Sequence, residues 1–331
     1  HSIQMQRGLS AVNLATPSIG GTMNIITDPA AASKGGMIKQ EVGQGSFLKS
    51  SMNYNTGLIG GNLAFSTTIV RKTGNGVIDK TWTDAWAYYF GASYQMDDKN
   101  RFEVYAVGAP QRHGQNLYKQ NIAAYDEEYA REVYSDETLA VDLEGNEDAD
   151  GNDIPNGNPD VFDKFMEHED GRLYNENVSD VSSSYTGQQY WYMYGEGGLF
   201  GGGLQDRHDP DFLNERENFF HKPLVNLNHY LTLSDNMRLS TIAYWSGGSG
   251  GGTGNYGSMR WNYHKGISSP SRWVHYDATI ERNSTNIDSS LSETEAKSLG
   301  ILRNSINRQN TIGVISKLNY DLSDAIKLQA G

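Results

Sequence analysis

The chain has 331 residues, a formal net charge of -13, no cysteine and a mean hydropathy of -0.62. The acidic balance, without a basic patch interleaved with aromatic residues, argues against a nucleic-acid partner. No run of 18 apolar residues occurs, which excludes a transmembrane helix. A transmembrane β-barrel stays open, because only every second residue of its strands faces lipid.

The first organised stretch is residues 7–27, RGLSAVNLATPSIGGTMNIIT. A Gly-Gly pair ahead of a short Ile/Thr run predicts a turn that feeds a buried strand over residues 23–27. Residues 28–36 are rich in Pro, Ala, Ser and Gly, which indicates a linker. We therefore expect a short strand unit, then a linker, then the main body of the chain.

Alternating runs follow the linker. The clearest covers residues 86–96, where Trp, Tyr, Phe, Ala, Tyr and Met fall on one face and smaller or polar residues fall mainly on the other. The same period of two recurs in residues 48–56, 63–70, 102–106, 225–233 and 312–320. The pattern predicts about nine antiparallel strands, each with one apolar and one polar face. Such strands suit a barrel with a wet or plugged lumen.

Short and long connections alternate between the predicted strands. Turns of Gly, Asp, Asn and Ser occur at 57–61, 97–100, 234–236 and 323–325, and longer connections are predicted at 72–84, 109–221 and 247–309. This alternation is typical of outer-membrane barrels, which have tight periplasmic turns and long extracellular loops. Six aromatic residues near strand ends are expected in an interfacial girdle: Trp82, Trp86, Tyr88, Tyr89, Trp245 and Tyr320.

The opening stretch resembles the end of the plug domain of TonB-dependent outer-membrane receptors, where a segment of the type RGP…YG…AIGG-x-INIIT precedes the first barrel strand. Further stretches resemble the branch of this family found in Bacteroidetes-type bacteria: HGQNLYKQNIAAYDEEYAREVYSDE, FFHKPLVNLNHYLTLSDN, GGSGGGTGNYG and ILRNSINRQNTIGVISKLNY. The starch-utilisation subtype usually ends its plug with a KDASA…YGSRAANGVI-like run, which is absent here. That departure weakens the case for a glycan importer with a surface-lipoprotein lid.

The resemblance implies an all-β fold, in which residues 1–33 are the end of a plug domain with its linker and residues 34–331 are the first part of an antiparallel transmembrane β-barrel. Because such barrels have 22 strands, we expect the chain to be a piece of a longer protein. The implied function is import of a scarce solute (a metal chelate, vitamin, peptide or glycan) across the bacterial outer membrane. The implied partners are the TonB-ExbB-ExbD complex, the small-molecule substrate, outer-membrane lipids and, less supported, a surface lipoprotein. No cofactor and no enzymatic chemistry are implied.

Four acidic or amide residues form a candidate metal site: Asp148, Asp150, Asn152 and Asp153. Oxygen side chains in a short Gly-containing loop suit Ca²⁺, and the stretch is similar to the DxDGDGIPD calcium repeats of secreted proteins. It departs from the EF-hand rule, because the sixth position is aspartate where glycine is required. A solvated acidic loop is the alternative interpretation.

Aromatic residues are dense in residues 185–200, and four of them are candidates for stacking on a ligand: Tyr190, Trp191, Tyr192 and Tyr194. Packing of the long loops against one another explains them equally well. His208, within the run Asp-Arg-His-Asp-Pro-Asp, could hold a transition metal, but a turn before a strand is favoured because a single His seldom completes a site.

Arg7 is a candidate lock between plug and barrel. By the resemblance, plug arginines are held by barrel glutamates, and the alternation places Glu41 and Glu103 on the lumen-facing side. A buried arginine without a partner would be costly, so a pairing is expected. One sequence does not decide which glutamate it uses.

Other function classes remain open at this point. An adhesin or a passive porin-like barrel would lack the plug-like opening stretch. A secreted, soluble calcium-dependent carbohydrate-binding β-protein would bury the apolar face as a core. A receptor that serves as one component of a larger surface complex is a further alternative. For an enzyme, the sequence shows no G-x-S-x-G, HExxH or P-loop motif.

Overall fold

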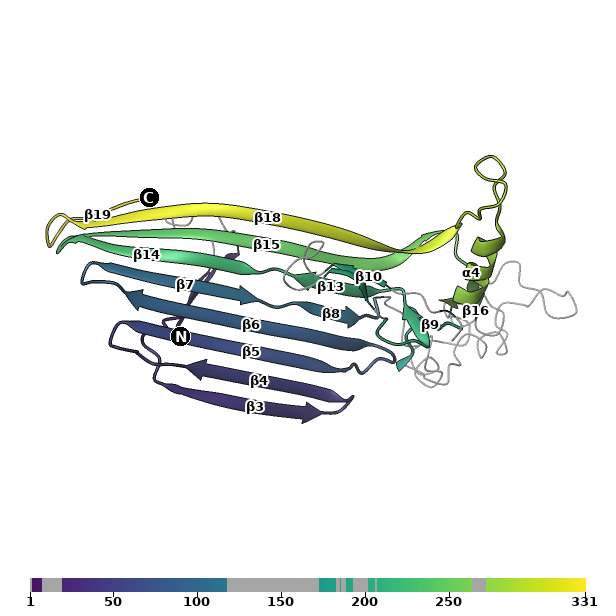
Figure 1. Ribbon diagram of the computed structural model, residues 1–331, viewed down its shortest axis with the longest axis horizontal. Coiled ribbons are helices and arrows are strands. Elements are labelled where there is room, and N and C mark those ends of the chain that lie inside the picture. Colours follow the sequence, from purple (N-terminus) through teal and green to yellow (C-terminus); the bar gives the residue numbers. More distant parts are fainter. Residues whose placement is uncertain are drawn as a thin grey trace, which may run out of the picture.

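The computed structural model describes residues 2–7, 20–117, 173–182, 185, 189–192, 202–205, 207–263 and 272–331. Within them, one antiparallel sheet of eleven strands dominates (Figure 1). Its strands in chain order are β3 (Gly35–Gly43), β4 (Phe47–Asn55), β5 (Leu63–Asn75), β6 (Trp82–Gln95), β7 (Asn100–Gly108), β8 (Gln111–Gly114), β13 (Glu217–His221), β14 (Leu224–Ser234), β15 (Met237–Gly257), β18 (Gly300–Asp321) and β19 (Lys327–Ala330). The prediction of an all-β, antiparallel fold is confirmed.

The eleven strands fill nine positions across the sheet. β7 and β8 both pair with β6 in one unbroken register, and β13 and β14 share a register with β15 that shifts only between Thr232 and Ser234. Pro110 and Pro223 cause the two interruptions, because proline has no N–H to donate to the ladder. Their carbonyls still accept hydrogen bonds from Trp86 N and Gly247 N at 2.8 and 2.9 Å. The expected number of about nine strands is therefore confirmed.

Four two-stranded units and one helix complete the described residues. β1 (Ser2–Arg7) pairs with β2 (Gly21–Ile26), which confirms the strand expected over residues 23–27 apart from its last residue. The others are β9 (Val178–Asp180) with β12 (Phe212–Asn214), β10 (Gln189–Tyr192) with β11 (Gly202–Gln205), β16 (Trp261–Tyr263) with β17 (Arg272–Val274), and helix α4 (Tyr276–Thr285). No helix in this part of the chain is long and apolar enough to cross a membrane.

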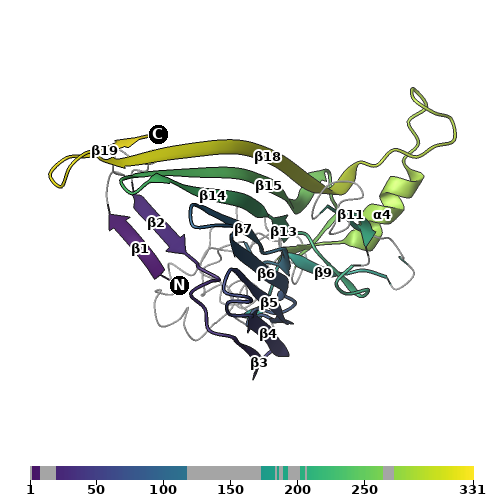
Figure 2. The ribbon, with the colours of Figure 1, turned by 60° about the vertical axis from the view of Figure 1, so that its left-hand side comes forward.

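The sheet bends, as Figure 2 shows, so that β14, β15 and β18 form one part and β3 to β6 the other. The β1–β2 hairpin lies on one side of the sheet in both views, within the angle of the bend in Figure 2. Short turns join the strands at one end, which we call the short-turn end. The connections after β8 and β15 leave from the opposite end, which we call the long-loop end.

The two faces of the sheet differ in chemistry because paired residues share a face. One face carries large apolar side chains that stay exposed, with Ile38 at 83% and Ile312 at 81%. Met52, Trp86, Phe90 and Leu227 lie on this apolar face as well, and all are more than a third exposed. The opposite, polar face carries Glu41, Glu103 and Asn228 in the matching registers. The two-faced pattern predicted from the alternation is thus confirmed.

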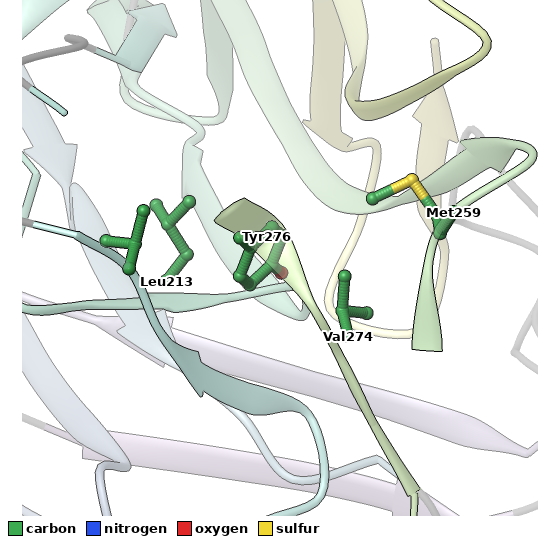
Figure 3. Packing of buried hydrophobic residues seen from close by; sticks show 5 residues of the cluster. Leu213, Met259, Val274 and Tyr276 are labelled. Carbon is green, nitrogen blue, oxygen red and sulfur yellow. The ribbon is translucent and has the colours of Figure 1, made fainter. Parts of the chain in front are cut away.

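Buried apolar packing is concentrated at the long-loop end. Val181, Leu213, Met259, Val274 and Tyr276 form one cluster with Trp261 against it (Figure 3). These residues come from separate segments, including β12, β17 and the start of α4. The cluster gives the long connections a small core of their own, which the single-layered sheet lacks.

Four sequence predictions need correction. β5 and β6 extend into the expected 72–84 connection and leave only residues 76–81 as a turn, while β15 and β18 shorten the expected 247–309 loop to residues 258–299. β8 and β13 likewise enter the expected 109–221 loop. Glycine and polar residues suggested loops, but these segments form strands because neighbouring strands supply hydrogen-bond partners in register. Tyr89, expected in the interfacial girdle, lies on the polar face against Tyr105.

Candidate functional site

The segment after β2 is seated on the polar face of the sheet. Tyr105 donates a hydrogen bond from its hydroxyl to Thr27 O at 2.7 Å. Pro29 is fully buried, and its Cγ would lie 3.1 Å from a Cβ at Gly91. Asp28 fixes the turn by accepting a hydrogen bond from Ala30 N at 2.9 Å. We call residues 27–33 the docked linker.

A buried carboxylate lies next to the docked linker. Glu103 is 4% exposed, and its Oε1 is 3.0 Å from the Arg101 guanidinium. The Tyr105 hydroxyl is 3.0 Å from Glu103 Oε2 as well as 2.7 Å from Thr27 O. Because a phenol carries one hydrogen, Tyr105 can donate it to the linker or to the carboxylate. Release of the linker therefore leaves Tyr105 with an acceptor.

Neighbouring strands support this cluster. Arg101 lies over the Tyr230 ring, with 4.7 Å between its Cζ and the ring centroid. Asn228 donates to the Tyr230 hydroxyl at 3.4 Å, and Asn226 donates to Asn228 Oδ1 at 2.8 Å. Paired and hydrogen-bonded charges can be buried, whereas an isolated one would be expelled or neutralised. The polar face is thus built to hold a charged group under the linker.

The predicted lock residues lie in different surroundings. Glu41 accepts from Lys39 at 2.8 Å and pairs with Lys49 at 3.0 Å, and Glu103 pairs with Arg101. Arg7 ends β1 opposite Gly21, and its side chain lies outside the described residues. Both glutamates lie on the polar face as predicted, and the pairing of Arg7 stays a prediction.

Two other predicted sites fall on residues that the structure does not describe. Asp148, Asp150, Asn152, Asp153 and Tyr194 lie outside the described residues. The main chain of Tyr190, Trp191 and Tyr192 belongs to β10, paired with β11, and their side chains are likewise not described. The calcium and aromatic-stacking sites stay predictions.

His208 stacks on an aromatic ring. Its imidazole lies 3.9 Å from the Trp82 ring, centroid to centroid, at an interplanar angle of 6°. Partial loss of hydration lowers the pKa of His208, although the residue keeps an exposed surface, and the nearby Arg112 lowers that pKa further. Within the described ranges, no group of three His, Asp or Glu residues is placed to hold a metal. The geometry supports the favoured interpretation of this run as a packed turn.

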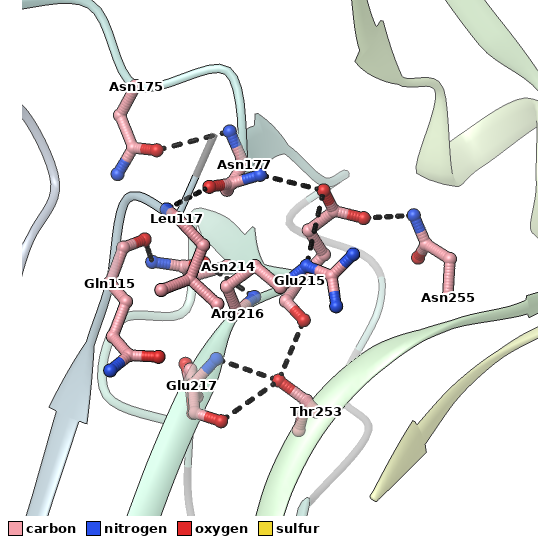
Figure 4. A network of polar contacts seen from close by, with 10 residues as sticks. All are labelled: Gln115, Leu117, Asn175, Asn177, Asn214, Glu215, Arg216, Glu217, Thr253 and Asn255. Carbon is pink, nitrogen blue, oxygen red and sulfur yellow. Dashed lines mark hydrogen bonds and ion pairs between the residues drawn. The ribbon is translucent and has the colours of Figure 1, made fainter. Parts of the chain in front are cut away.

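A polar network ties five segments together at the long-loop end (Figure 4). Glu215 is 1% exposed and accepts from Asn177 Nδ2 at 2.8 Å and from Asn255. Asn177 Oδ1 accepts from Leu117 N at 2.9 Å, and Thr253 Oγ1 donates to Glu215 O at 2.9 Å. Asn175 extends the network to the 76–81 turn by donating to Asp79 O. We call this network the loop clamp.

Next to the loop clamp, Glu217 is buried beside Arg112 and Arg207 at the long-loop end of β13. Burial raises the pKa of Glu217 to about 7, although both arginines act in the opposite direction. Its Oε2 has no hydrogen-bond partner among the described residues. The carboxyl group therefore changes charge near neutral pH.

A groove of about 840 Å³ opens on the polar face between β13, β15 and β18. All of its lining residues except Lys222 fell within the connections predicted at 109–221 and 247–309, so the sequence interpretation missed it. The available signal was glycine at the alternate positions 248, 250, 252 and 254. Alternate glycines open a smooth strip along one face of a strand.

No protein-family model and no curated protein matches this sequence. Among solved structures, the chain is similar to the ferripyoverdine receptor of the outer membrane of Pseudomonas aeruginosa, with 11% identity and a TM-score of 0.39. It is also similar to the siderophore receptor PiuA from Acinetobacter baumannii, with 8% identity and a TM-score of 0.45. The ferric-catecholate import receptor Fiu from E. coli K12 matches with 9% identity and a TM-score of 0.34.

These similarities extend over nearly the whole chain. They cover 99%, 99% and 97% of it for the ferripyoverdine receptor, PiuA and Fiu. The chain spans only 40%, 49% and 57% of the length of those three proteins.

Proposed function

We propose that this chain is the end of the plug domain and the first part of the barrel of a TonB-dependent transporter of the bacterial outer membrane. The observation that carries the proposal is the docked linker, which sits on the polar face of a sheet whose opposite face exposes apolar side chains. A lipid-facing outer surface and an occupied lumen account for both features together. The resemblance of residues 7–27 to the end of a plug points in the same direction.

In the proposed mechanism the long loops capture a solute at the long-loop end, which would be extracellular. Pull by the TonB-ExbB-ExbD complex would then shift the plug and open a path along the polar face. The docked linker would be the last tether between plug and barrel, with Tyr105 exchanging its acceptor from Thr27 O to Glu103 as the linker moves. This role needs no covalent chemistry from the chain.

The apolar face argues against the secreted soluble β-protein. That fold would bury its alternating apolar residues between two layers, whereas Ile38 and Ile312 are more than four-fifths exposed. An adhesin or passive porin gives no reason for a linker seated on the lumen face. We further propose that the acidic loop around Asp148 binds Ca²⁺ and that Tyr190, Trp191, Tyr192 and Tyr194 stack on the solute. The solute itself is to be identified by direct measurement.

Two adjacent substitutions on β18 test the proposal. Ile312 lies on the apolar face and Thr311 on the polar face. In a membrane barrel, Ile312→Arg should cost about 2 to 4 kcal/mol and deplete the outer-membrane fraction, because a charge would face lipid. Thr311→Arg is the matched control and should leave membrane insertion unchanged. Equal, detergent-free solubility of both variants would contradict the membrane assignment.

A second arm tests import. The protein is purified from outer membranes in mild detergent, and co-purifying small molecules are identified by mass spectrometry. Uptake of any retained solute is then measured in cells with and without TonB. Uptake that is independent of TonB would exclude energised transport. Of the proposal, only the membrane-barrel fold would then stand.

A further inference from the structure

The groove between β13, β15 and β18 has a floor made almost entirely of backbone. On the polar face of β15, positions 248, 250, 252 and 254 are all glycine. Gly252 is paired on one side with Asn218 and on the other with Ser305. Gly250 is paired in the same way with Phe220 and Asn307. At each of these positions a glycine of β15 therefore lies between larger residues of β13 and β18. The three strands form a trough whose floor is β15.

Backbone conformation does not require these glycines. None of the four has a positive φ, although Gly257 at the end of the strand does. A Cβ at Gly252 would meet nothing closer than Asn218 Nδ2 at 3.4 Å, and one at Gly248 nothing closer than 3.7 Å. Larger residues could be accommodated at these two positions, and they would fill the trough. Glycine in a strand interior commonly marks a close approach by a ligand or by another backbone.

The walls of the trough are cationic. Arg303 and Lys222 are exposed, and neither takes part in an ion pair within the described part of the chain. Arg216 lies over Gly254, with its Nη1 2.9 Å from the position of a Cβ there, and its Nε is 3.9 Å from Glu215 Oε1. Among the described residues that line the groove, there is no aspartate or glutamate.

The nearest carboxylates do not belong to the groove lining, and of the three cations only Arg216 is paired with one of them, Glu215, among the described residues. Glu215 is held by Asn177 and Asn255 in the loop clamp, and Glu217 lies on the opposite face of β13 beside Arg112. The rest of the wall is polar, with Asn218, Asn307 and Gln309 able to donate or accept. A net acidic protein thus presents a local cationic strip.

The trough is elongated. Six residue steps separate Gly248 from Gly254, which is about 20 Å along a strand. The Arg216–Gly254–Arg303 end carries two guanidinium groups, and Lys222 marks the other end beside Gly248. Tyr256, exposed at 60%, flanks Arg303 at 5.3 Å and adds an aromatic surface beyond the two arginines. A volume of about 840 Å³ is within the range of ligand-binding clefts.

We propose that this groove binds an extended polyanion, with oxyanion groups (carboxylate or phosphate) spaced to meet Arg303 and Arg216 at one end and Lys222 at the other. The inference rests on the proposed import function and names the class of solute that would be captured. Guanidinium groups bind carboxylate and phosphate through paired, charge-assisted hydrogen bonds. The glycine floor lets the ligand lie close to the sheet.

Direct binding to the detergent-purified protein tests this assignment. Calorimetric titrations would use hexaglutamate as the carboxylate probe and tripolyphosphate as the phosphate probe, with hexalysine and maltohexaose as cationic and neutral controls. Hexaglutamate fits the length of the trough when extended, at about 20 Å. We expect one or both polyanions to bind and neither control to bind. The comparison of hexaglutamate with tripolyphosphate shows whether the groove prefers carboxylate or phosphate.

Variants assign the binding to the groove. Arg303→Gln and Lys222→Gln should each weaken polyanion binding about tenfold, the loss expected for one charge-assisted hydrogen bond. Gly252→Val should abolish binding while keeping every charge, because it fills the floor. Lys317→Gln, on the same face of β18 but away from the groove, is the matched control and should bind normally.

Two results would overturn the inference: no binding of either polyanion by the wild-type protein, or equal binding by wild type, Arg303→Gln and Gly252→Val. Tight binding of maltohexaose with no binding of polyanions would replace the polyanion by a neutral glycan. These titrations need neither TonB nor a membrane. Absence of polyanion binding would therefore overturn this inference without affecting the import proposal. Conversely, the Ile312→Arg and uptake experiments can contradict the import proposal while polyanion binding is still observed.

Discussion

Removal of one hydroxyl should loosen the docked linker. In the wild-type protein the Tyr105 hydroxyl donates to Thr27 O at 2.7 Å, beside the fully buried Pro29. Tyr105→Phe removes this hydrogen bond from the docked state, whereas water hydrates Thr27 O once the linker is released. The net value of such a bond is about 1 kcal/mol, so the released population should rise about fivefold.

Cysteine labelling can measure the released population, because these 331 residues contain no cysteine. A single Ala30→Cys substitution on the linker would report release as the rate of reaction with a maleimide. We expect about fivefold faster labelling in the Tyr105→Phe background. Tyr94→Phe is the control, because Tyr94 lies on the apolar face and is 42% exposed.

A second variant separates the hydrogen bond from general loosening of the sheet. Gly91→Ala keeps Tyr105 but places a Cβ against the Tyr89 hydroxyl and 3.1 Å from Pro29 Cγ, so it should also speed labelling by displacing the Tyr89 ring and pressing on the linker. If neither Tyr105→Phe nor Gly91→Ala changes the labelling rate relative to Tyr94→Phe, the contacts of residues 27–33 do not hold the linker.

Two further predictions concern the long-loop end. Burial raises the pKa of Glu217 from 4.5 to about 7. Between these pH values the folded protein keeps a proton that the unfolded chain releases. The free energy of unfolding should therefore fall by about 3 kcal/mol as the pH rises across that window. Glu217→Gln should remove the fall, matching wild type at pH 4 and exceeding it at pH 8 in thermal unfolding; parallel pH profiles would contradict this. Asn177→Ala should destabilise the loop clamp by about 3 kcal/mol, because it deprives the buried Glu215 of a donor and Leu117 N of its acceptor. Proteolysis of the long connections should accelerate, and unchanged resistance would show that the clamp does not restrain them.

Strand identity was readable from the sequence because alternation is a local property. The run at 86–96 predicted most of β6, and the runs at 48–56 and 225–233 predicted β4 and β14 to within one or two residues at each end. The alternation also placed Glu41 and Glu103 on one face, since a side chain's face follows from its parity along the strand. The expected number of strand positions followed from the same rule.

The predicted loop boundaries were wrong where a strand segment lacked alternating apolar residues. The glycine-rich half of β15 has no hydrophobic period of its own, yet all its residues from Gly247 to Gly257 are paired with β18. A partner strand stabilises such a segment through main-chain hydrogen bonds, which leave no signature in its side chains. The same holds for residues 72–75 and 82–84, which continue β5 and β6.

The strands, their two faces and the short turns could be predicted from local sequence, because they depend on neighbours one or two residues apart. The seat of the linker on Tyr105, the loop clamp around Glu215 and the cationic trough became visible in the folded chain. Each of these joins segments that are tens of residues apart in the chain. Their geometry depends on the register among several strands, and a local pattern does not contain that register.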